Sequence, residues 1–269
     1  AIVASRDIDV PSSVTVVYVK DTRKAMEDMV PFFFDYPTRK MRMIALTGTN
    51  GKTTTTHVAA HILHHAGHKT GVIGTIHALI GDKEIPTHNT TPDVIDLDRI
   101  LARMAEEKVE YVCMEVSSHS LVLGRVAGCE FDDAVFTNLT EDHLDFHKTM
   151  ENYCDAKAIL FQNCGTGVVN ADDPWTPRLL KNASCQVRTY GEKTAADLRA
   201  ENIVLSADGI AFDAVTAVER VPIQVHIPGG FMVYNTLDVL AAAQALGISL
   251  GESAAVLAKV PHVQGRVEV

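Results

Sequence analysis

The chain has 269 residues, of which 46% are hydrophobic and 22% are charged, and its formal net charge is −10. These values are typical of a globular protein that is large enough for one sizeable core and a smaller appendage. The acidic balance argues against a nucleic-acid surface, which needs a basic stripe. The apolar runs are shorter than the roughly 20 residues of a membrane-spanning helix, and no secretory leader is visible. We therefore expect a cytoplasmic protein without a nucleic-acid or membrane partner.

The cysteine pattern predicts free thiols. The five cysteines are odd in number and widely spread, and no two of them form a C-x-x-C pair. A disulfide framework or a zinc site needs closer spacing. Free thiols in a reducing compartment are the simpler interpretation for Cys113, Cys129, Cys154, Cys164 and Cys185.

The first forty residues predict one strand at 14–19, one helix at 21–34 begun by Asp21, and a linker at 36–38. A single strand and a single helix cannot bury their own apolar faces. We therefore expect residues 1–38 to be the remnant of a larger N-terminal domain.

From Met41 onward, strand patterns alternate with helix patterns. Strands are expected at 43–47, 70–75, 111–116, 133–137 and 167–170, and helices at 52–65, 92–107, 231–246 and 252–259. This alternation predicts an α/β fold with a doubly wound, mostly parallel sheet, in a central domain over residues 41–269. Alternating polar and apolar residues around a turn at 207–209 predict a small antiparallel extension at 200–227.

A glycine-rich loop joins the strand at 43–47 to the next helix and reads Gly48-Thr49-Asn50-Gly51-Lys52-Thr53. Its glycines let several backbone N–H groups face one anion at a helix N-terminus. Lys52 would then reach the terminal phosphates of a nucleotide, and the Thr53 hydroxyl would bind magnesium. The spacing departs from the standard Walker motif, whose first glycine falls on Leu46, so a glycine turn with a chance lysine is the alternative. The flanking strand and helix favour nucleotide binding.

Polar residues also follow the strands at 111–116 and 133–137. Glu115 ends the first of them, where a carboxylate either holds Mg²⁺ beside the phosphates or is simply a solvated acid at a strand end. His143 and Lys157 come after the second. A neutral histidine can bind a metal but an ammonium group cannot, so Lys157 becomes a ligand only after modification, for example by CO₂ to a carbamate.

A set of histidines between positions 57 and 68 includes i,i+4 pairs, the spacing of some zinc sites. No glutamate completes an H-E-x-x-H motif. A helix face that is partly exposed to water therefore explains these histidines better than a metal site does.

A series of segments resembles the Mur ligases, in order along the chain. They are 48–56 (GTNGKTTTT), 89–92 (NTTP), 115–119 (EVSSH), 124–126 (GRV), 137–147 (TNLTEDHLDFH), 153–157 (YCDAK), 170–173 (NADD) and 265–268 (GRVE). The phosphate loop alone is shared with folylpolyglutamate and cyanophycin synthetases. The combination is closest to the members that add the third amino acid to UDP-N-acetylmuramoyl-L-alanyl-D-glutamate.

The resemblance implies a cytoplasmic, ATP- and Mg²⁺-dependent ligase of peptidoglycan precursor synthesis, which we expect to be a monomer. Such a ligase makes an acyl phosphate on the UDP-N-acetylmuramoyl dipeptide and joins it to a diamino acid. Meso-diaminopimelate is favoured over L-lysine because it is the more frequent of the two.

The family also implies roles for residues at matching motif positions. ATP would be bound by Gly48, Thr49, Asn50, Gly51, Lys52, Thr53, Thr54, Asn235 and Arg266. One Mg²⁺ would be held by Thr53 and Glu115, and a second by His143 and carbamylated Lys157. The UDP-muramoyl dipeptide would be bound by Asn89, Thr90, Thr91, Ser117 and Arg125. The residues expected to act in catalysis are Lys52, Glu115, His143 and Lys157.

The sequence departs from the family pattern in several places. Leu123 stands where some relatives carry a substrate-binding glutamine, and Met232 where an asparagine near the adenine is usual. Much of the uridine-binding domain and the whole C-terminal amino-acid-binding domain are also expected to be absent. We therefore expect this chain to fold and bind ATP without making the amide bond alone.

Two alternatives stay open. The first is another ligase of the same superfamily, such as a cyanophycin synthetase, against which the segments at 89–92 and 115–126 argue. The second is a non-catalytic nucleotide-binding module. The presence of Glu115, His143 and Lys157 disfavours that module, because docking of ATP needs fewer metal ligands.

Overall fold

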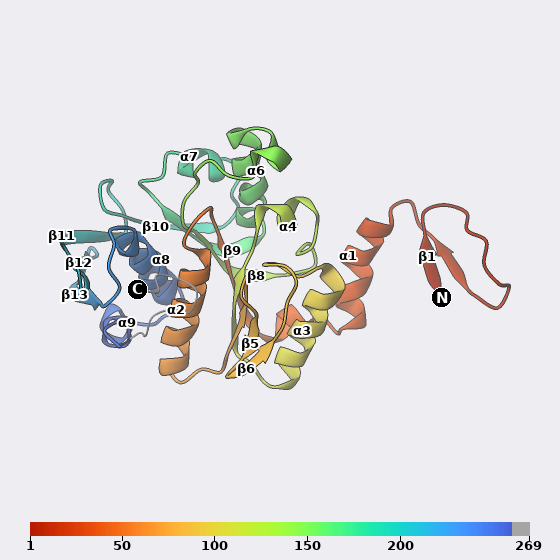
Figure 1. Ribbon diagram of the computed structural model, residues 1–269, viewed down its shortest axis with the longest axis horizontal. Coiled ribbons are helices and arrows are strands. Elements are labelled where there is room, and N and C mark those ends of the chain that lie inside the picture. Colours follow the sequence, from red (N-terminus) through yellow and green to blue (C-terminus); the bar gives the residue numbers. More distant parts are fainter. Residues whose placement is uncertain (260–269) are drawn as a thin grey trace.

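The computed structural model describes residues 1–259, which form an α/β fold (Figure 1). Its strands are β1 (Ile2–Ala4), β2 (Val16–Tyr18), β3 (Arg42–Thr47), β4 (Thr70–Ile73), β5 (Ala78–Ile80), β6 (Lys83–Ile85), β7 (Tyr111–Glu115), β8 (Phe131–Phe136), β9 (Cys164–Asn170), β10 (Gln186–Gly191), β11 (Leu198–Ser206), β12 (Gly209–Val215) and β13 (Arg220–Val225). Its helices are α1 (Thr22–Phe33), the 3₁₀ helix η1 (Pro37–Lys40), α2 (Lys52–His65), α3 (Val94–Glu106), α4 (Ser118–Val122), α5 (Leu144–His147), α6 (Met150–Phe161), α7 (Thr176–Leu179), α8 (Phe231–Ala245) and α9 (Leu250–Leu257).

One large sheet organises the described residues, with the strand order β13-β12-β11-β10-β9-β8-β3-β7-β4-β5-β6. The strands from β11 to β4 in this order pair in parallel. The expected doubly wound, mostly parallel sheet is therefore confirmed. The predicted antiparallel extension is also present as β11-β12-β13, and it continues the same sheet because β11 pairs with β10. A second antiparallel edge, β4-β5-β6, was not predicted.

Hydrophobic cores cover both faces of this sheet. Consecutive residues of β3 point to opposite faces, so Ile44 packs with α2 and α8, and Met43 packs with α3 and α6. Both side chains are fully buried. Helices on both faces explain why the parallel strands read as continuous apolar runs rather than as alternating patterns.

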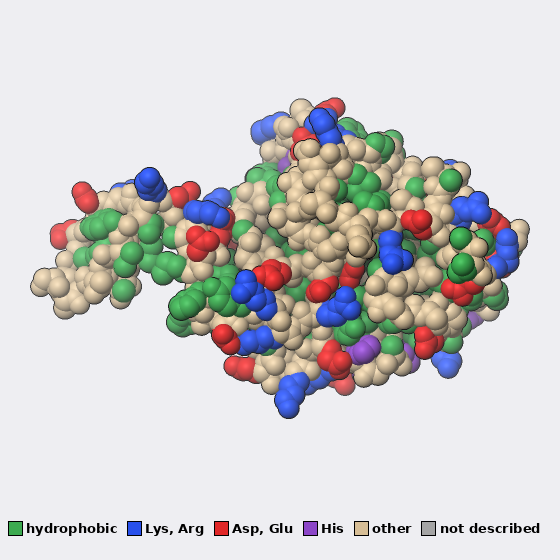
Figure 2. Space-filling model, turned by 180° about the vertical axis from the view of Figure 1, so that it is seen from behind, with side chains coloured by type: hydrophobic (Ala, Val, Ile, Leu, Met, Phe, Trp, Pro, Cys, Tyr) green, Lys and Arg blue, Asp and Glu red, His purple; other side chains and the backbone are tan. Residues whose placement is uncertain are grey.

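The N-terminal segment protrudes from this body (Figure 1). The helix begins as predicted, with the Asp21 carboxylate accepting hydrogen bonds from the N–H groups of Arg23 (2.8 Å) and Lys24 (3.3 Å). The predicted strand is shortened to β2, which pairs in parallel with β1. Hydrophobic side chains gather over this segment (Figure 2), and Phe33 is 80% exposed. The assignment of residues 1–38 to a separate domain stays a prediction.

Two predicted boundaries were wrong for identifiable reasons. The helix expected to begin at Pro92 begins at Val94, because the preceding Asp93 is extended and its carboxylate pairs with Arg125 at 2.7 Å. The strand expected to reach Thr75 ends at Ile73, because Thr75 turns aside and donates its N–H to Glu115 at 2.9 Å. Both corrections lie beside the residues of the candidate site.

In residues 1–259, no helix combines the length and the hydrophobicity that crossing a bilayer requires. The cysteines are free thiols, and Cys113, Cys129 and Cys154 are buried. The predicted ATP contact of Arg266 lies outside the described residues.

Candidate active site

The glycine-rich loop links β3 to α2 and depends on its two glycines. Gly48 has φ +151° and Gly51 has φ +88°, conformations that favour glycine. A Cβ atom at Gly48 would lie 1.9 Å from Oγ1 of Thr137, and one at Gly51 would lie 2.5 Å from Oδ1 of Asn235. Larger residues at either position would therefore displace the loop or the wall that faces it.

The loop is held in shape by the segment that follows β8. Asn138 accepts from the N–H of Thr49 through its backbone carbonyl (2.8 Å) and from the N–H of Asn50 through Oδ1 (3.0 Å). Its amide also donates to the carbonyl of Asn50 at 3.1 Å. The N–H groups of Thr49 and Asn50 are thus bonded to Asn138 rather than directed at a ligand. The first turn of α2 is left to supply N–H donors for an anion, because those groups have no partner within a helix.

The two lysines predicted for catalysis meet at one carbonyl oxygen. The Lys52 amine donates to the carbonyls of Gly48 (3.0 Å) and Thr49 (2.9 Å), and the Lys157 amine donates to that of Gly48 at 2.9 Å. Lys157 is buried, with 1% of its surface exposed. Burial, followed by the nearby charge of Lys52, holds the pKa of Lys157 well below its usual value.

Glu115 lies at the carboxyl end of β7, and it is 1% exposed rather than solvated. Its carboxylate accepts hydrogen bonds from Oγ1 of Thr53 (3.1 Å) and from both the N–H (2.9 Å) and Oγ1 (3.0 Å) of Thr75. A Cβ at Gly74 would come within 2.4 Å of this carboxylate. The structure thus brings Thr53 and Glu115 together, and hydroxyl and carboxylate oxygens are donors that suit magnesium.

His143 and Lys157, the second predicted pair of metal ligands, do not contact each other as Thr53 and Glu115 do. The backbone of His143 is in the left-handed region, with φ +53°, and its N–H donates to the Asp142 carboxylate at 2.8 Å. His143 and Lys157 both approach Tyr153, with a ring-to-ring distance of 6.1 Å for His143 and 4.6 Å from the Lys157 amine to the ring centroid. Among residues 1–259, no three His, Cys, Asp or Glu side chains form a metal-binding group. An unmodified Lys157 does not fit a metal site with His143, so that ligand pair stays a prediction.

Two of the predicted substrate residues, Thr91 and Ser117, lie next to Glu115, and a third, Arg125, contacts Thr91. Oγ1 of Thr91 donates to the Glu115 carbonyl (2.9 Å) and accepts from the N–H of Ser117 (3.1 Å). Arg125 donates to the Thr91 carbonyl at 3.2 Å while it pairs with Asp93. One hydroxyl, that of Thr91, therefore fixes the loop at 89–92 to the end of β7, which carries Glu115.

The other two predicted substrate residues differ in position. Oγ1 of Thr90 is 3.1 Å from Oγ1 of Thr75, which is itself bound to Glu115. Asn89 instead lines a separate hollow of about 270 Å³ together with Asp96 and Arg99. Thr90 thus belongs with the Glu115 cluster, and Asn89 does not contact it in this structure.

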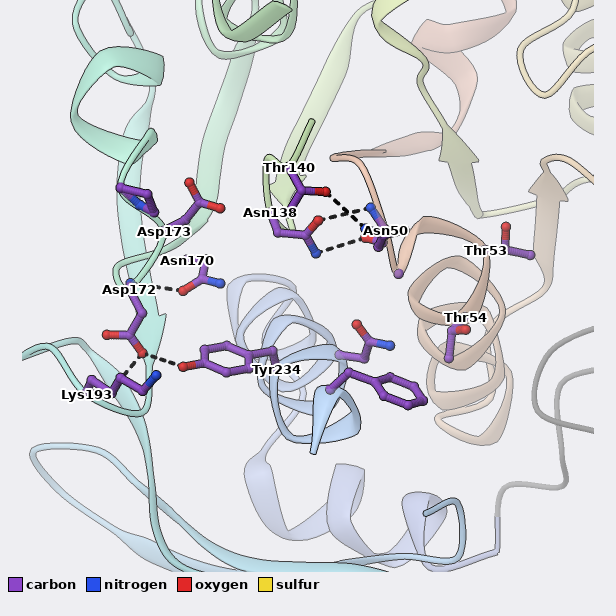
Figure 3. Close-up of a pocket in the computed structure, with 14 residues that line it drawn as sticks. Asn50, Thr53, Thr54, Asn138, Thr140, Asn170, Asp172, Asp173, Lys193 and Tyr234 are labelled. Atoms are coloured by element: carbon purple, nitrogen blue, oxygen red, sulfur yellow. Dashed lines mark hydrogen bonds between the residues drawn. The ribbon is translucent and has the colours of Figure 1, made fainter. Parts of the chain in front are cut away.

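A cleft of about 800 Å³ opens beside the phosphate loop (Figure 3). Its wall includes five of the residues that sequence analysis assigned to ATP: Asn50, Gly51, Thr53, Thr54 and Asn235. The rest of the wall had no predicted role in ATP binding: Asn138, Thr140, Asn170, Asp172, Asp173, Pro174, Lys193, Phe231 and Tyr234. Residues 170–173 were noted only as one of the segments that resemble the family; Asn170 ends β9, and Asp172 and Asp173 follow it. Met232 is 3% exposed and packs in the core, whereas Asn235 lines the cleft.

Comparison with known proteins decides the family. The sequence pattern described as "Mur ligase middle domain" matches residues 46–243. The chain belongs to the Mur ligase family. Two curated relatives are named UDP-N-acetylmuramoyl-L-alanyl-D-glutamate–2,6-diaminopimelate ligases. The Bacillus cereus protein is 45% identical across 100% of this chain and 56% of its own length. The Clostridium acetobutylicum protein is 46% identical across 95% of this chain and 53% of its own length.

A solved structure of a ligase with the same name superposes on this Mur ligase chain with a TM-score of 0.88 and 29% identity, covering 99% of this chain and 55% of that one. This Mur ligase chain therefore spans about half the length of the relatives that it matches. The likeness confirms the predicted fold and family. It also places the glycine loop, Glu115 and the cleft within the segment that matches the middle domain.

Proposed function

We propose that this Mur ligase chain is the ATP-binding part of an enzyme that joins meso-diaminopimelate to UDP-N-acetylmuramoyl-L-alanyl-D-glutamate. The contact between Thr53 and Glu115 at the base of the glycine loop carries the proposal, because it combines a phosphate cradle with magnesium ligands. The names of the similar curated proteins support this choice of substrates and favour diaminopimelate over lysine. The same proposal gives the enzyme a cytoplasmic location, as a monomer.

Bound Mg-ATP would supply a transferable phosphoryl group, which turns the dipeptide carboxylate into an electrophile that an amine can attack. The residues of the chain would bind and orient the reactants. The first turn of α2 would donate N–H groups to phosphate oxygens. Lys52 would exchange the carbonyls of Gly48 and Thr49 for the phosphates and offset their negative charge. Thr53 and Glu115 would hold the magnesium ion.

The dipeptide would be oriented from the side of Glu115. Thr90 and Ser117 offer hydroxyl groups there, and Arg125, which is paired with Asp93 in this structure, offers a guanidinium whose fork suits a carboxylate. Thr91 already ties this loop to the Glu115 backbone. A substrate carboxylate bound by these residues would therefore lie near the metal and the phosphate loop, and positioning of this kind lowers the barrier of a two-substrate reaction.

Calorimetric titration of the chain with Mg-ATP, with and without UDP-N-acetylmuramoyl-L-alanyl-D-glutamate, tests the proposal. We expect ATP to bind, and the dipeptide to change its affinity because the two sites share Glu115 and Thr91. ATP binding that is indifferent to saturating dipeptide would favour a nucleotide-binding module of another kind. Absence of ATP binding at millimolar concentration would contradict the proposal altogether.

A further inference from the structure

Asp172 sits in the wall of the cleft and binds groups from two other segments of the chain. Its Oδ2 accepts from the N–H of Glu192 (2.6 Å), the N–H of Lys193 (3.0 Å) and the hydroxyl of Tyr234 (3.0 Å). Its Oδ1 accepts from the N–H of Thr194 at 2.6 Å. Figure 3 shows Asp172, Lys193 and Tyr234 grouped together at one side of the cleft. The carboxylate thus joins the end of β9 to the turn after β10 and to the start of α8.

These contacts leave Asp172 little capacity to bind a ligand directly. A carboxylate in a dinucleotide cleft commonly accepts hydrogen bonds from ribose hydroxyls. Here both oxygens are already engaged by four donors of the protein. Partial burial acts to raise the pKa of Asp172, but the N–H groups of Lys193, Glu192 and Thr194 outweigh it and lower the pKa to about 2. The charged carboxylate therefore holds the turn in place at all ordinary pH values.

What the turn presents to the cleft is the side chain of Lys193. Of the described residues that line the cleft, Lys193 is the one with a cationic side chain. It lies on the opposite side of the view from Asn50, Thr53 and Thr54, which belong to the phosphate loop and the start of α2 (Figure 3). With phosphates bound at that loop, the nucleoside would extend towards Lys193. An ammonium group donates up to three hydrogen bonds, and ribose oxygens and purine ring nitrogens accept them.

We propose that Asp172 is a positioning residue for the nucleoside half of ATP, and that it acts by fixing the turn that brings the Lys193 amine against the ribose and base. This inference rests on the proposed ATP site and adds its nucleoside end. Tyr234 belongs to the same arrangement, because its hydroxyl donates to Asp172 and its ring forms part of the cleft wall.

The test compares two probes, Mg-ATP and inorganic tripolyphosphate with Mg²⁺, by calorimetry on the parent chain and on Asp172→Asn. The variant keeps the size of the side chain but loses its charge and one acceptor oxygen. ATP affinity should fall about tenfold, and tripolyphosphate affinity should change by less than about twofold. A general loosening of the structure would weaken the binding of both probes to the same extent. An unchanged ratio of the two dissociation constants in Asp172→Asn would overturn the inference.

Lys193→Ala tests whether Asp172 acts through Lys193. It keeps the backbone N–H that Asp172 accepts, so the turn should persist while ATP affinity falls selectively. Combining it with Asp172→Asn should cost little more than either change alone, because both remove the same contact. If the losses of ATP affinity in the two single variants add fully in the double variant, Asp172 does not act through Lys193. If Asp172→Asn fails to fold, the affinities for ATP and tripolyphosphate can be compared in Tyr234→Phe instead, which removes only the hydroxyl that donates to Asp172.

Asp197→Asn is the matched control. Asp197 also fixes a neighbouring connection, accepting from the N–H (2.8 Å) and hydroxyl (2.9 Å) of Thr189, but it does not line the cleft. Both probes should bind this variant as they bind the parent, and a selective loss of ATP here would contradict a special role for Asp172. Binding of neither probe to the parent would overturn the proposed ATP site itself. Normal binding with an unchanged ratio in Asp172→Asn overturns only the inference about Asp172.

Discussion

Lys52 and Lys157, which are 105 positions apart in the chain, donate to the same carbonyl oxygen, that of Gly48, at 3.0 and 2.9 Å. Two ammonium groups at one acceptor repel each other, and the repulsion is strong where water is excluded. This repulsion is relieved when Lys52 moves onto a phosphate or when Lys157 loses its positive charge.

Replacement of Lys52 by alanine should weaken Mg-ATP binding by more than about tenfold, or about 1.4 kcal/mol, because the phosphates lose their nearest cation. Calorimetry measures the affinity, and thermal unfolding should show that the domain stays folded. Lys83→Ala is a suitable control, because Lys83 is an exposed lysine paired only with Glu107 in the described residues. Equal affinities for Lys52→Ala and the parent would contradict the predicted role.

Lys157 should carry a carbamate when Mg-nucleotide is bound at neutral or mildly alkaline pH. It lies in a dry site beside Gly48 and matches the modified lysine that the family resemblance implies. Carbon-13 NMR with labelled bicarbonate should show a carbamate signal that disappears in Lys157→Ala. Three extra atoms of density on Nζ would give the same answer in a crystal. An unmodified amine under these conditions, with metal and nucleotide bound, would count against the prediction.

Glu115→Gln should remove most of the effect of magnesium on ATP binding. The amide keeps an oxygen that can accept from Thr75, but it loses the negative charge that attracts the ion. For the parent, we expect ATP affinity to fall when EDTA removes the metal. In the variant, the affinities with and without EDTA should agree within about twofold. A parent-like dependence on magnesium would show that the ion binds elsewhere.

The strongly patterned parts of the fold could be predicted from sequence. The run from β3 through the glycine loop to α2 combines a buried apolar strand, two glycines and a helix pattern in consecutive residues, so its structure depends on local signals. The edge strands β5 and β6 were missed because each has three residues, too few to show a period.

The nucleoside end of the cleft could not be predicted, because its parts meet only in the folded sheet. Asp172 follows β9, its partners at 192–194 follow β10, and Tyr234 lies on α8. Pairing of β9 with β10 brings these segments together. No local pattern shows that an aspartate after a strand will accept hydrogen bonds from a turn about twenty positions later. The same reason explains the helix start misplaced at Pro92, which depends on the distant Arg125.

Asp133 gives the chain a pH-dependent stability that mutation should remove. The residue is 2% exposed, and its Oδ2 has no hydrogen-bond partner among the described residues. Burial raises its pKa from 3.8 to about 6. Between these values the folded chain holds a proton that the unfolded chain has released. The free energy of unfolding should therefore decrease as the pH rises from about 4 to 6.

Asp133→Asn removes this titration. The free energy of unfolding of the variant should therefore rise relative to that of the parent as the pH increases across the same window. Urea unfolding at pH 4 and pH 7 measures the change, and the variant should gain about 2 kcal/mol on the parent between the two values. Asp208→Asn, at an exposed turn position, should show no such gain. The amide could itself lack a partner and lower stability, but that cost is the same at both pH values and cancels in the difference. A parallel pH dependence for Asp133→Asn and the parent would show that Asp133 binds protons equally in the folded and the unfolded chain over this window, and would contradict the predicted shift.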